Sequence, residues 1–425
     1  MKSFPFDPRR IPFFYGWIVL GAGTLGMIMS VPGQTVGVSV FTDFLLDDLG
    51  LSRSSLSLAY LIGTIASALS LGAAGVLYDR HGGRRVAVGA ALAMAVVLVY
   101  LSILPSLAAA RPVLGFVAVT LGFWGLRFSG QGMLTLASRN MVMEWFDRRR
   151  GMANAVMGIS ISFGFSAAPR AFEAVIGPDG EWQRAWQLIS LIVVAFAVLA
   201  MVFYRDRPED HGMVPDGPMA TSAGRTHAET APGRAFTLPE ARRTYTFWVF
   251  AATLLLAGLL LTAYTFHIVS IFGDAGMSRR QAVGIFLPAA AVAVVVEFAG
   301  SWLSDYIKLK YLAMVQLAGA FVLSLSLAGL NGGAPVAGVI VGHGFMQGMF
   351  GILSNVTWPR FFGRRHLGAI AGFATAITVA GTAVGPALFS GVRDLTGTYS
   401  AAALGTAAVA VVLLVLMTRA DRPAQ

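Results

Sequence analysis

The residues best suited to bind an anion in this sequence form two pairs that are related by one repeat. Gln131-Gly132-Met133 recurs as Gln347-Gly348-Met349, an offset of 216 residues, and the same offset carries Arg127 onto His343. A guanidinium can hold a carboxylate through two parallel hydrogen bonds, and a histidine ring titrates near neutral pH. We therefore predict that Arg127, Gln131, His343 and Gln347 contact an anion. His343 could also carry a proton, or it could only join two helices.

Arg127 lies near the middle of a long apolar run, where an unpaired charge is unfavourable. An arginine at that depth costs at least about 2.5–3.5 kcal/mol, so it needs a partner or a water-filled cavity. The partner could be a bound anion or a permanent carboxylate such as Glu297. Glu297 has two interpretations as well, because a desolvated carboxyl can carry a proton and an ionised one can pair with Arg127 or Arg139.

Three further polar residues are candidate substrate contacts. Gln34 follows Pro32-Gly33, a pair that interrupts a helix and exposes backbone groups. Gln34 could therefore bind substrate or only solvate the kink. Tyr264 and His267 lie in the outer half of a later apolar run, where they could belong to an outer gate or to the polar membrane boundary.

The composition of the chain requires a membrane around the elements that carry these residues. Of 425 residues, 56% are hydrophobic and 12% are charged, which is more apolar surface than a soluble domain can bury. Twelve apolar runs of roughly 20 residues are each long enough to cross a bilayer as a helix. These runs lie near 13–41, 55–78, 86–104, 113–138, 151–177, 184–204, 245–272, 281–304, 311–330, 335–358, 367–392 and 400–418.

The pattern predicts an all-α membrane protein with twelve transmembrane helices in two pseudo-symmetric six-helix bundles. The first bundle is expected at 1–204 and the second at 244–425, joined by a linker at 205–243 that contains five prolines. Lys and Arg gather in alternate loops, so the positive-inside rule places both termini and the linker in the cytoplasm. The net charge of +10 could suggest nucleic acid as a partner, but the distribution of Lys and Arg in alternate loops argues against it. The chain has no cysteine, and we expect no metal and no cofactor.

The most specific motif follows the second apolar run and reads Gly75-Val76-Leu77-Tyr78-Asp79-Arg80-His81-Gly82-Gly83-Arg84-Arg85. A weaker copy follows the eighth run and includes Asp305. A small residue permits close helix approach, and an acid at this depth can meet a helix N-terminus. With the twelve runs and the long linker, the motif resembles the loop signature of the major facilitator superfamily. The resemblance implies two bundles that rock about a central cavity lined by helices 1, 4, 7 and 10. It also implies a cytoplasmic gate, which would comprise Gly75, Asp79, Arg80, Arg84 and Asp305.

A narrower resemblance is to bacterial relatives of the monocarboxylate transporters and oxalate/formate exchangers. It rests on Tyr15-Gly16-Trp17, Trp145-Phe146 and the segment from Asp394 to Tyr399. It implies small organic anions as substrates, often coupled to protons. The sequence departs from this pattern at Glu297, where those carriers commonly have an Arg, and the eleventh run has no interior Lys.

We expect a secondary active transporter that moves a small organic anion, a monocarboxylate, by alternating access, with protons as an optional coupled ion. An exporter of drug-like or amphipathic compounds is one alternative, suggested by Gly381 and Gly385-Pro386. A non-transporting membrane sensor is another. No phosphate-binding loop or nucleophile motif favours a pump or an enzyme. The expected setting is the lipid bilayer of a bacterial inner membrane, with the protein as a monomer.

Overall fold

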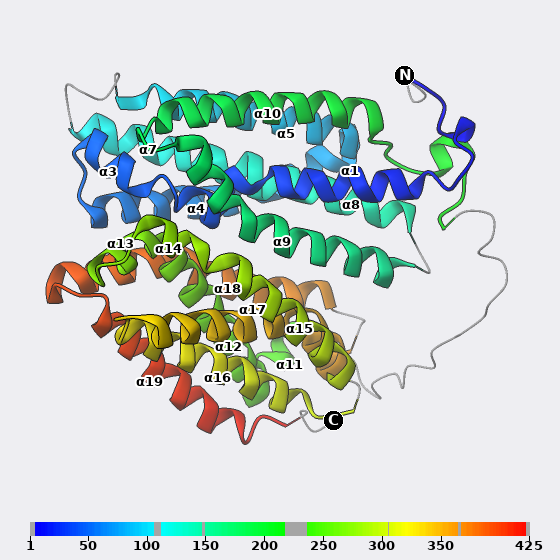
Figure 1. The fold of residues 1–425 in the computed structure, drawn as a ribbon. Coiled ribbons are helices and arrows are strands. Elements are labelled where there is room, and N and C mark those ends of the chain that lie inside the picture. Colours follow the sequence, from blue (N-terminus) through cyan, green and yellow to red (C-terminus); the bar gives the residue numbers. More distant parts are fainter. Residues whose placement is uncertain are drawn as a thin grey trace. The chain divides into compact units, whose positions relative to one another are not determined.

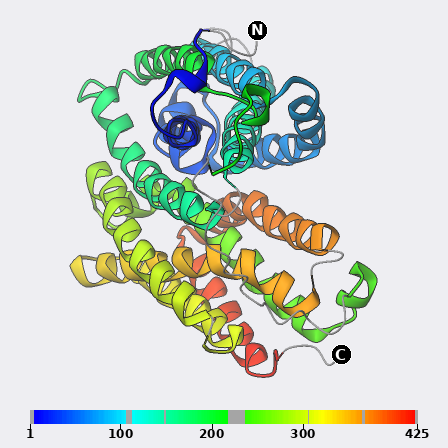
Figure 2. The ribbon, with the colours of Figure 1, turned by 90° about the vertical axis from the view of Figure 1, so that its right-hand side faces the viewer.

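The structure is a computed structural model, and it describes residues 5–105, 112–146, 149–216, 236–304, 306–363 and 367–421. Within these ranges every regular element is a helix, which confirms the predicted all-α class. The chain divides into two compact units, Met1–Thr226 and His227–Gln425. Figures 1 and 2 show that the long helices of each unit run side by side.

Unit 1 contains six long helical stretches with short elements between them. The first stretch is α1 (Gly16–Met29), which ends in the 3-10 turn η2 (Val31–Gly33) and the short helices α2 (Thr35–Val38) and α3 (Thr42–Leu49). The others are α4 (Arg53–His81), α5 (Gly83–Ser102), α7 (Pro112–Leu126) continuing through η3 (Arg127–Leu134) into α8 (Thr135–Trp145), α9 (Arg150–Ile176) and α10 (Trp182–Phe203). Two short 3-10 turns, η1 (Pro8–Arg10) and η4 (Glu209–His211), lie near its ends.

Unit 2 begins with the short helix α11 (Leu238–Ala241) and the long helix α12 (Tyr245–Phe266). Two short helices follow, α13 (Ile268–Asp274) and α14 (Arg279–Gly284). The remaining long helices are α15 (Phe286–Ser304), α16 (Leu309–Ala328), α17 (Gly333–Phe362), α18 (Leu367–Thr396) and α19 (Ser400–Met417). Within the described part of this unit, α12 packs along α18, and α16 packs along both α17 and α19.

Eleven helices among the described residues are long and apolar enough to cross a membrane. Their bounds follow the predicted runs, as in the spans Gly83–Ser102 and Ser400–Met417. The predicted fifth run corresponds to α9, which has 27 residues but does not count among the eleven. α9 contains Pro169 as well as Arg170 and Glu173, and these residues lower its apolar character.

Small residues allow close helix contacts in both units. In unit 2, a Cβ on Gly385 of α18 would collide with the carbonyl oxygen of Leu259 in α12, and one on Gly381 would lie 2.6 Å from the carbonyl oxygen of Leu255. The glycines expected from a Gly-Pro motif therefore serve the close packing of α12 and α18.

Candidate functional site

Arg127 begins an unusual turn near the middle of the candidate span Val113–Trp145. Residues Arg127–Leu134 form a π-helix between the α-helical segments α7 and α8. Such wide turns are rare and are often found at functional sites. Three of the eight residues are small, Ser129, Gly130 and Gly132, which favours the distorted geometry.

The guanidinium of Arg127 is enclosed by polar and aromatic groups of unit 1. Only 3% of the Arg127 surface is exposed. Nη1 lies 3.4 Å from the hydroxyl of Thr35, which is hydrogen-bonded to the hydroxyl of Tyr60 at 2.6 Å. The guanidinium carbon lies 5.3 Å from the centre of the Tyr60 ring, a cation–π distance. Within the described part of its unit, Arg127 forms no ion pair, and its Nε has no hydrogen-bond partner.

The interruption after α1 packs directly against this π-helical segment. A Cβ on Gly33 would lie 2.9 Å from the Cα of Gly130 and 3.0 Å from the backbone nitrogen of Gln131, and it would also collide with the carbonyl oxygen of Leu126. Only a glycine allows this approach. The predicted helix break therefore helps to position Arg127, which the sequence pattern did not indicate.

Arg127 and Gln131 are four residues apart in the π-helix, and their side chains differ in exposure. Arg127 is buried, whereas Gln131 is exposed. Gln34 is partly buried, and its amide nitrogen donates to the Ser30 hydroxyl at 3.2 Å. That contact fits the interpretation in which Gln34 solvates the kink.

In unit 2, two of the candidate residues are hydrogen-bonded partners. The hydroxyl of Tyr264 on α12 bonds to Nδ1 of His343 on α17. The two rings meet edge to face with their centres 5.7 Å apart, and the Phe286 ring lies 6.2 Å from His343 on another side. Tyr264 is fully buried, so this bond is shielded from solvent.

His267 occupies a separate position at the end of α12. It is fully buried, and its Nε2 lies 2.9 Å from the carbonyl oxygen of Pro386 in α18. A carbonyl only accepts, so Nε2 carries the proton. The His267 ring also lies 5.4 Å from that of Tyr399. These contacts link α12 to α18 and give His267 a clear structural role.

Glu297 and Gln347 are exposed on α15 and α17. The carboxylate of Glu297 lies beside Gly351 of α17, where an added Cβ would be 3.4 Å from Oε1. Within the described part of unit 2, neither side chain forms a hydrogen bond or an ion pair.

The predicted gate motif is only partly described. Asp305 lies outside the described residues, and for Gly75 and Asp79 only the α4 backbone is described. Arg80 is exposed in the last turn of α4. The backbone nitrogen of Arg84 donates to Asp206 at 2.7 Å, and its guanidinium donates to the carbonyl oxygen of Met201.

Thr35, Tyr60 and Asp206 were not predicted from the sequence to take part in these contacts. Thr35 and Tyr60 contact Arg127 although they lie far from it in sequence. No local pattern marks such a contact, because it depends on how three helices pack. For Asp206 a signal exists, since Asp206-Arg207-Pro208 recurs as Asp421-Arg422-Pro423 at the end of the second unit.

Comparison with known proteins identifies relatives over most of the chain. The family model described as Major Facilitator Superfamily matches residues 18–386. A hexuronate transporter of Bacillus subtilis is 25% identical over 415 residues, which cover 91% of this chain and 90% of the relative. A probable nitrate/nitrite transporter of Mycobacterium tuberculosis is 26% identical over 293 residues, which cover 66% of this chain and 65% of the relative.

Solved structures share the same fold at low sequence identity. A bacterial homolog of the human lysosomal transporter Spinster, in an inward-facing and unoccupied conformation, has a TM-score of 0.68 and 14% identity, and the match covers 95% of both chains. The nucleoside transporter NupG has a TM-score of 0.66 and 14% identity, covering 94% of this chain and 98% of that one.

Proposed function

We propose, from the premise that this chain belongs to the major facilitator superfamily of transporters, that it carries a small monocarboxylate anion by alternating access. In this proposal, Arg127 holds the carboxylate through two hydrogen bonds. The proposed further contacts are Gln34, which follows the kink, and the repeat-related residues Gln131, His343 and Gln347.

The observation that carries the proposal is the environment of Arg127. The guanidinium of an arginine stays protonated in proteins, so a buried guanidinium needs a group that compensates its charge. Thr35 and the ring of Tyr60 supply one long hydrogen bond and a cation–π contact. Neither supplies a negative charge, and Nε is unused. An incoming carboxylate would compensate the cation and use the free donors.

The relatives support an anion as the substrate class. A hexuronate carries one carboxylate, and nitrate is a planar anion with oxygens spaced to meet a guanidinium in the same bidentate way. A single arginine fits both shapes. The monocarboxylate is favoured here because the longer and more complete match is to the hexuronate carrier.

Proton coupling is assigned to Glu297 or His343 in this proposal. The exposed Glu297 is not held by an ion pair within the described part of its unit, so it could bind and release a proton during a cycle. His343 is held by Tyr264 through Nδ1, which leaves Nε2 as its remaining proton site.

The test is uptake by purified protein in liposomes, with labelled glucuronate, lactate and nitrate, each with and without a pH gradient. We expect one of the two carboxylates to be transported and the other anions to compete weakly. Arg127→Gln and Arg127→Lys should each lower uptake at least about 100-fold, because both lose the bidentate grip, which is worth roughly 3 kcal/mol.

Arg139→Gln is the matched control, since Arg139 is exposed on the adjoining helix α8. It should transport normally. Full activity in both Arg127 variants would refute the assigned role of Arg127. Transport of nitrate but of neither carboxylate would refute the substrate class.

A further inference from the structure

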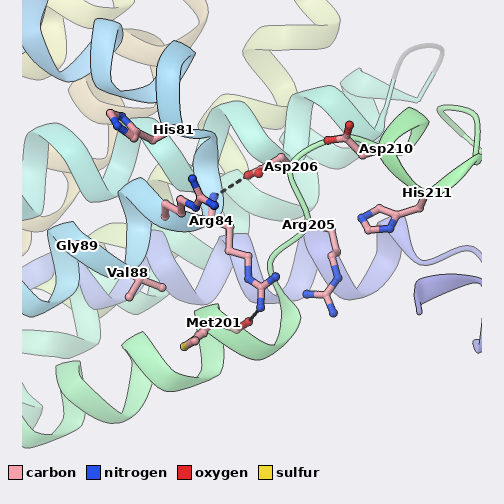
Figure 3. Close-up of a pocket in the computed structure, with 10 residues that line it drawn as sticks. His81, Arg84, Val88, Gly89, Met201, Arg205, Asp206, Asp210 and His211 are labelled. Atoms are coloured by element: carbon pink, nitrogen blue, oxygen red, sulfur yellow. Dashed lines mark hydrogen bonds between the residues drawn. The ribbon is translucent and has the colours of Figure 1, made fainter. Parts of the chain in front are cut away.

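A pocket of about 800 Å³ opens in unit 1 at the level where two candidate membrane spans end (Figure 3). The span of α5 begins at Gly83 and that of α10 ends at Phe203. The pocket includes the first turns of α5, the last turn of α10 and the segment that follows it. It therefore lies at a membrane surface, whichever way the chain is oriented.

One side of the pocket is basic. Arg84, Arg85 and Arg205 line it together with the acids Asp206 and Asp210, which gives a formal charge of +1 with neutral histidines. Arg205 is committed to the fold, because its guanidinium donates to the carbonyl oxygens of Val202, Tyr204 and Phe6.

Arg84 and Arg85 keep most of their donors available. Among the described residues, the guanidinium of Arg84 makes one hydrogen bond, to the carbonyl oxygen of Met201 (Figure 3). Arg85 is exposed and forms no hydrogen bond or ion pair with a described residue. Asp206 accepts from the backbone nitrogen of Arg84 and so caps α5; its charge also acts on the Arg84 guanidinium, but without a hydrogen bond to it.

The equivalent place in unit 2 is built differently. The offset that relates Asp79 to Asp305 also relates Arg84 to Lys310. There, Asp421 takes the position of Asp206 but forms ion pairs with Lys310 at 2.8 Å and Lys308 at 3.1 Å. Lys308 and Lys310 of unit 2 are thus paired with a carboxylate, whereas Arg84 and Arg85 form no ion pair with a described residue of unit 1.

The other side of the pocket is apolar and continues along the helices. Val88, Gly89 and Met201 line it. A Cβ on Gly89 would meet no atom within 4 Å, so a groove is open at this position of α5. Further along, the same two helices expose apolar side chains such as Val96, which is 68% exposed, and Val198, which is 60% exposed.

We propose that this pocket binds an anionic phospholipid, with its phosphate between Arg84 and Arg85 and an acyl chain along Gly89. The combination of two available guanidinium groups with an open apolar groove at a membrane surface fits an amphiphile that carries a phosphate. Basic pockets between transmembrane helices bind such head groups. A free phosphate would use the cations but would leave the groove empty.

The first experiment removes the charges and measures phosphatidylglycerol bound to the purified full-length protein by native mass spectrometry. Each cation near a membrane surface contributes a factor of about 5, so Arg85→Gln should weaken binding about fivefold and the double variant Arg84→Gln/Arg85→Gln about 25-fold. Arg139→Gln is the control with the same charge change at an exposed site of the same unit. Arg85 forms no hydrogen bond or ion pair with a described residue, so Arg85→Gln should fold normally, and a wild-type affinity in it and in the double variant would overturn the proposal.

The second experiment separates a lipid from a free anion. Gly89→Leu fills the open groove and should lower phosphatidylglycerol binding, whereas Gly158→Leu, on α9 and equally free of neighbours, should not. Inorganic phosphate added at the same concentration as the lipid should not displace it, and phosphatidylcholine should bind equally weakly to wild type and to Arg85→Gln. Displacement by inorganic phosphate, or equal lipid binding by the two glycine variants, would overturn the assignment to a phospholipid.

Discussion

At the scale of single residues, the least ordinary feature of this molecule is a buried arginine that has no negative partner among the described residues of its own unit. Thr35 and Tyr60 hold the guanidinium in place by a hydrogen bond and a cation–π contact. These contacts orient Arg127 without neutralising it. Only 3% of the Arg127 surface is exposed, so the proposed binding of an anion requires that Arg127 become accessible during the transport cycle.

Tyr60 offers a test of this orientation. Tyr60→Phe keeps the ring under the guanidinium and removes the hydroxyl that bonds Thr35 at 2.6 Å. We expect a Km for the transported anion that rises about 5- to 30-fold, because Arg127 loses an indirect support worth roughly 1–2 kcal/mol, while the maximal rate changes less. Uptake measured over a range of substrate concentrations separates the two quantities. Unchanged kinetics in Tyr60→Phe would mean that this chain of hydrogen bonds does not position Arg127.

The bond between Tyr264 and His343 predicts a difference between two tyrosines of unit 2. Tyr264→Phe removes the hydroxyl from a buried pair and should lower the free energy of unfolding by about 1–3 kcal/mol. Tyr245→Phe removes a hydroxyl that bonds the carbonyl oxygen of Leu416 on an exposed residue, where water can replace it. Thermal unfolding of both variants in detergent makes the comparison. Equal losses would contradict a special contribution from the buried pair.

At the scale of elements, the interruption of α1 and the π-helix of the α7–α8 stretch form one structural unit. Gly33 and Gly130 touch through their backbones, and the Thr135 hydroxyl reaches Ser30 at 3.2 Å. Two departures from α-helix thus stabilise each other. The arrangement fixes the start of the π-helix, where Arg127 is located.

Alanine substitutions test this contact. Gly33→Ala places a methyl group against the carbonyl oxygen of Leu126 and the Cα of Gly130, so we expect a loss of about 1–3 kcal/mol in stability and a large loss of transport. Gly21→Ala on α1 meets no atom within 4 Å and is the matched control. Uptake and thermal unfolding would be measured on both. A Gly33→Ala protein with normal stability and transport would show that the contact can relax without consequence.

The sequence predicted the helices well because each span needs a long apolar run, and the bounds of α5 and α19 follow directly from such runs. It also predicted the break at Pro32-Gly33. It could not predict that the run at 113–138 contains a π-helix, since small residues permit that turn without requiring it. The partners of Arg127 were missed for the same kind of reason: Thr35 and Tyr60 come from other helices, and packing brings them there.

A pH-dependent contact in unit 2 joins Asp421 to the start of α16. Hydrogen bonds from Lys310, and next from Lys308, hold the pKa of Asp421 below its usual value of 3.8. A carboxylate with a lowered pKa stabilises the fold above its usual pKa, and this contribution disappears as the pH falls below 3.8. Hydrogen exchange of residues 418–421, corrected for the intrinsic rate, should therefore lose protection in acid. Asp421→Asn should show low protection both at neutral pH and in acid. If this variant lost protection in acid as the wild type does, the assignment would be contradicted.

At the scale of the whole chain, the repeat explains both what the units share and where they differ. In each unit an aspartate that follows the last long helix contacts the first turn of the third long helix; it is Asp206 in unit 1 and Asp421 in unit 2. Asp206 uses a backbone nitrogen, whereas Asp421 uses two lysines. The repeat thus preserves a structural contact, while the guanidinium groups of Arg84 and Arg85 form no ion pair with the described residues of unit 1.

The orientation of the chain in the membrane can be tested directly with single cysteine variants, because the sequence contains no native cysteine. The positive-inside rule places the segment after α10 in the cytoplasm and the turn between α9 and α10 outside. Glu209 and Asp179 are exposed residues in these two places. In intact cells, a membrane-impermeant maleimide should label Asp179→Cys and should label Glu209→Cys only after permeabilisation. The reverse pattern would invert the topology, and it would place the basic pocket around Arg84 and Arg85 at the outer surface of the membrane.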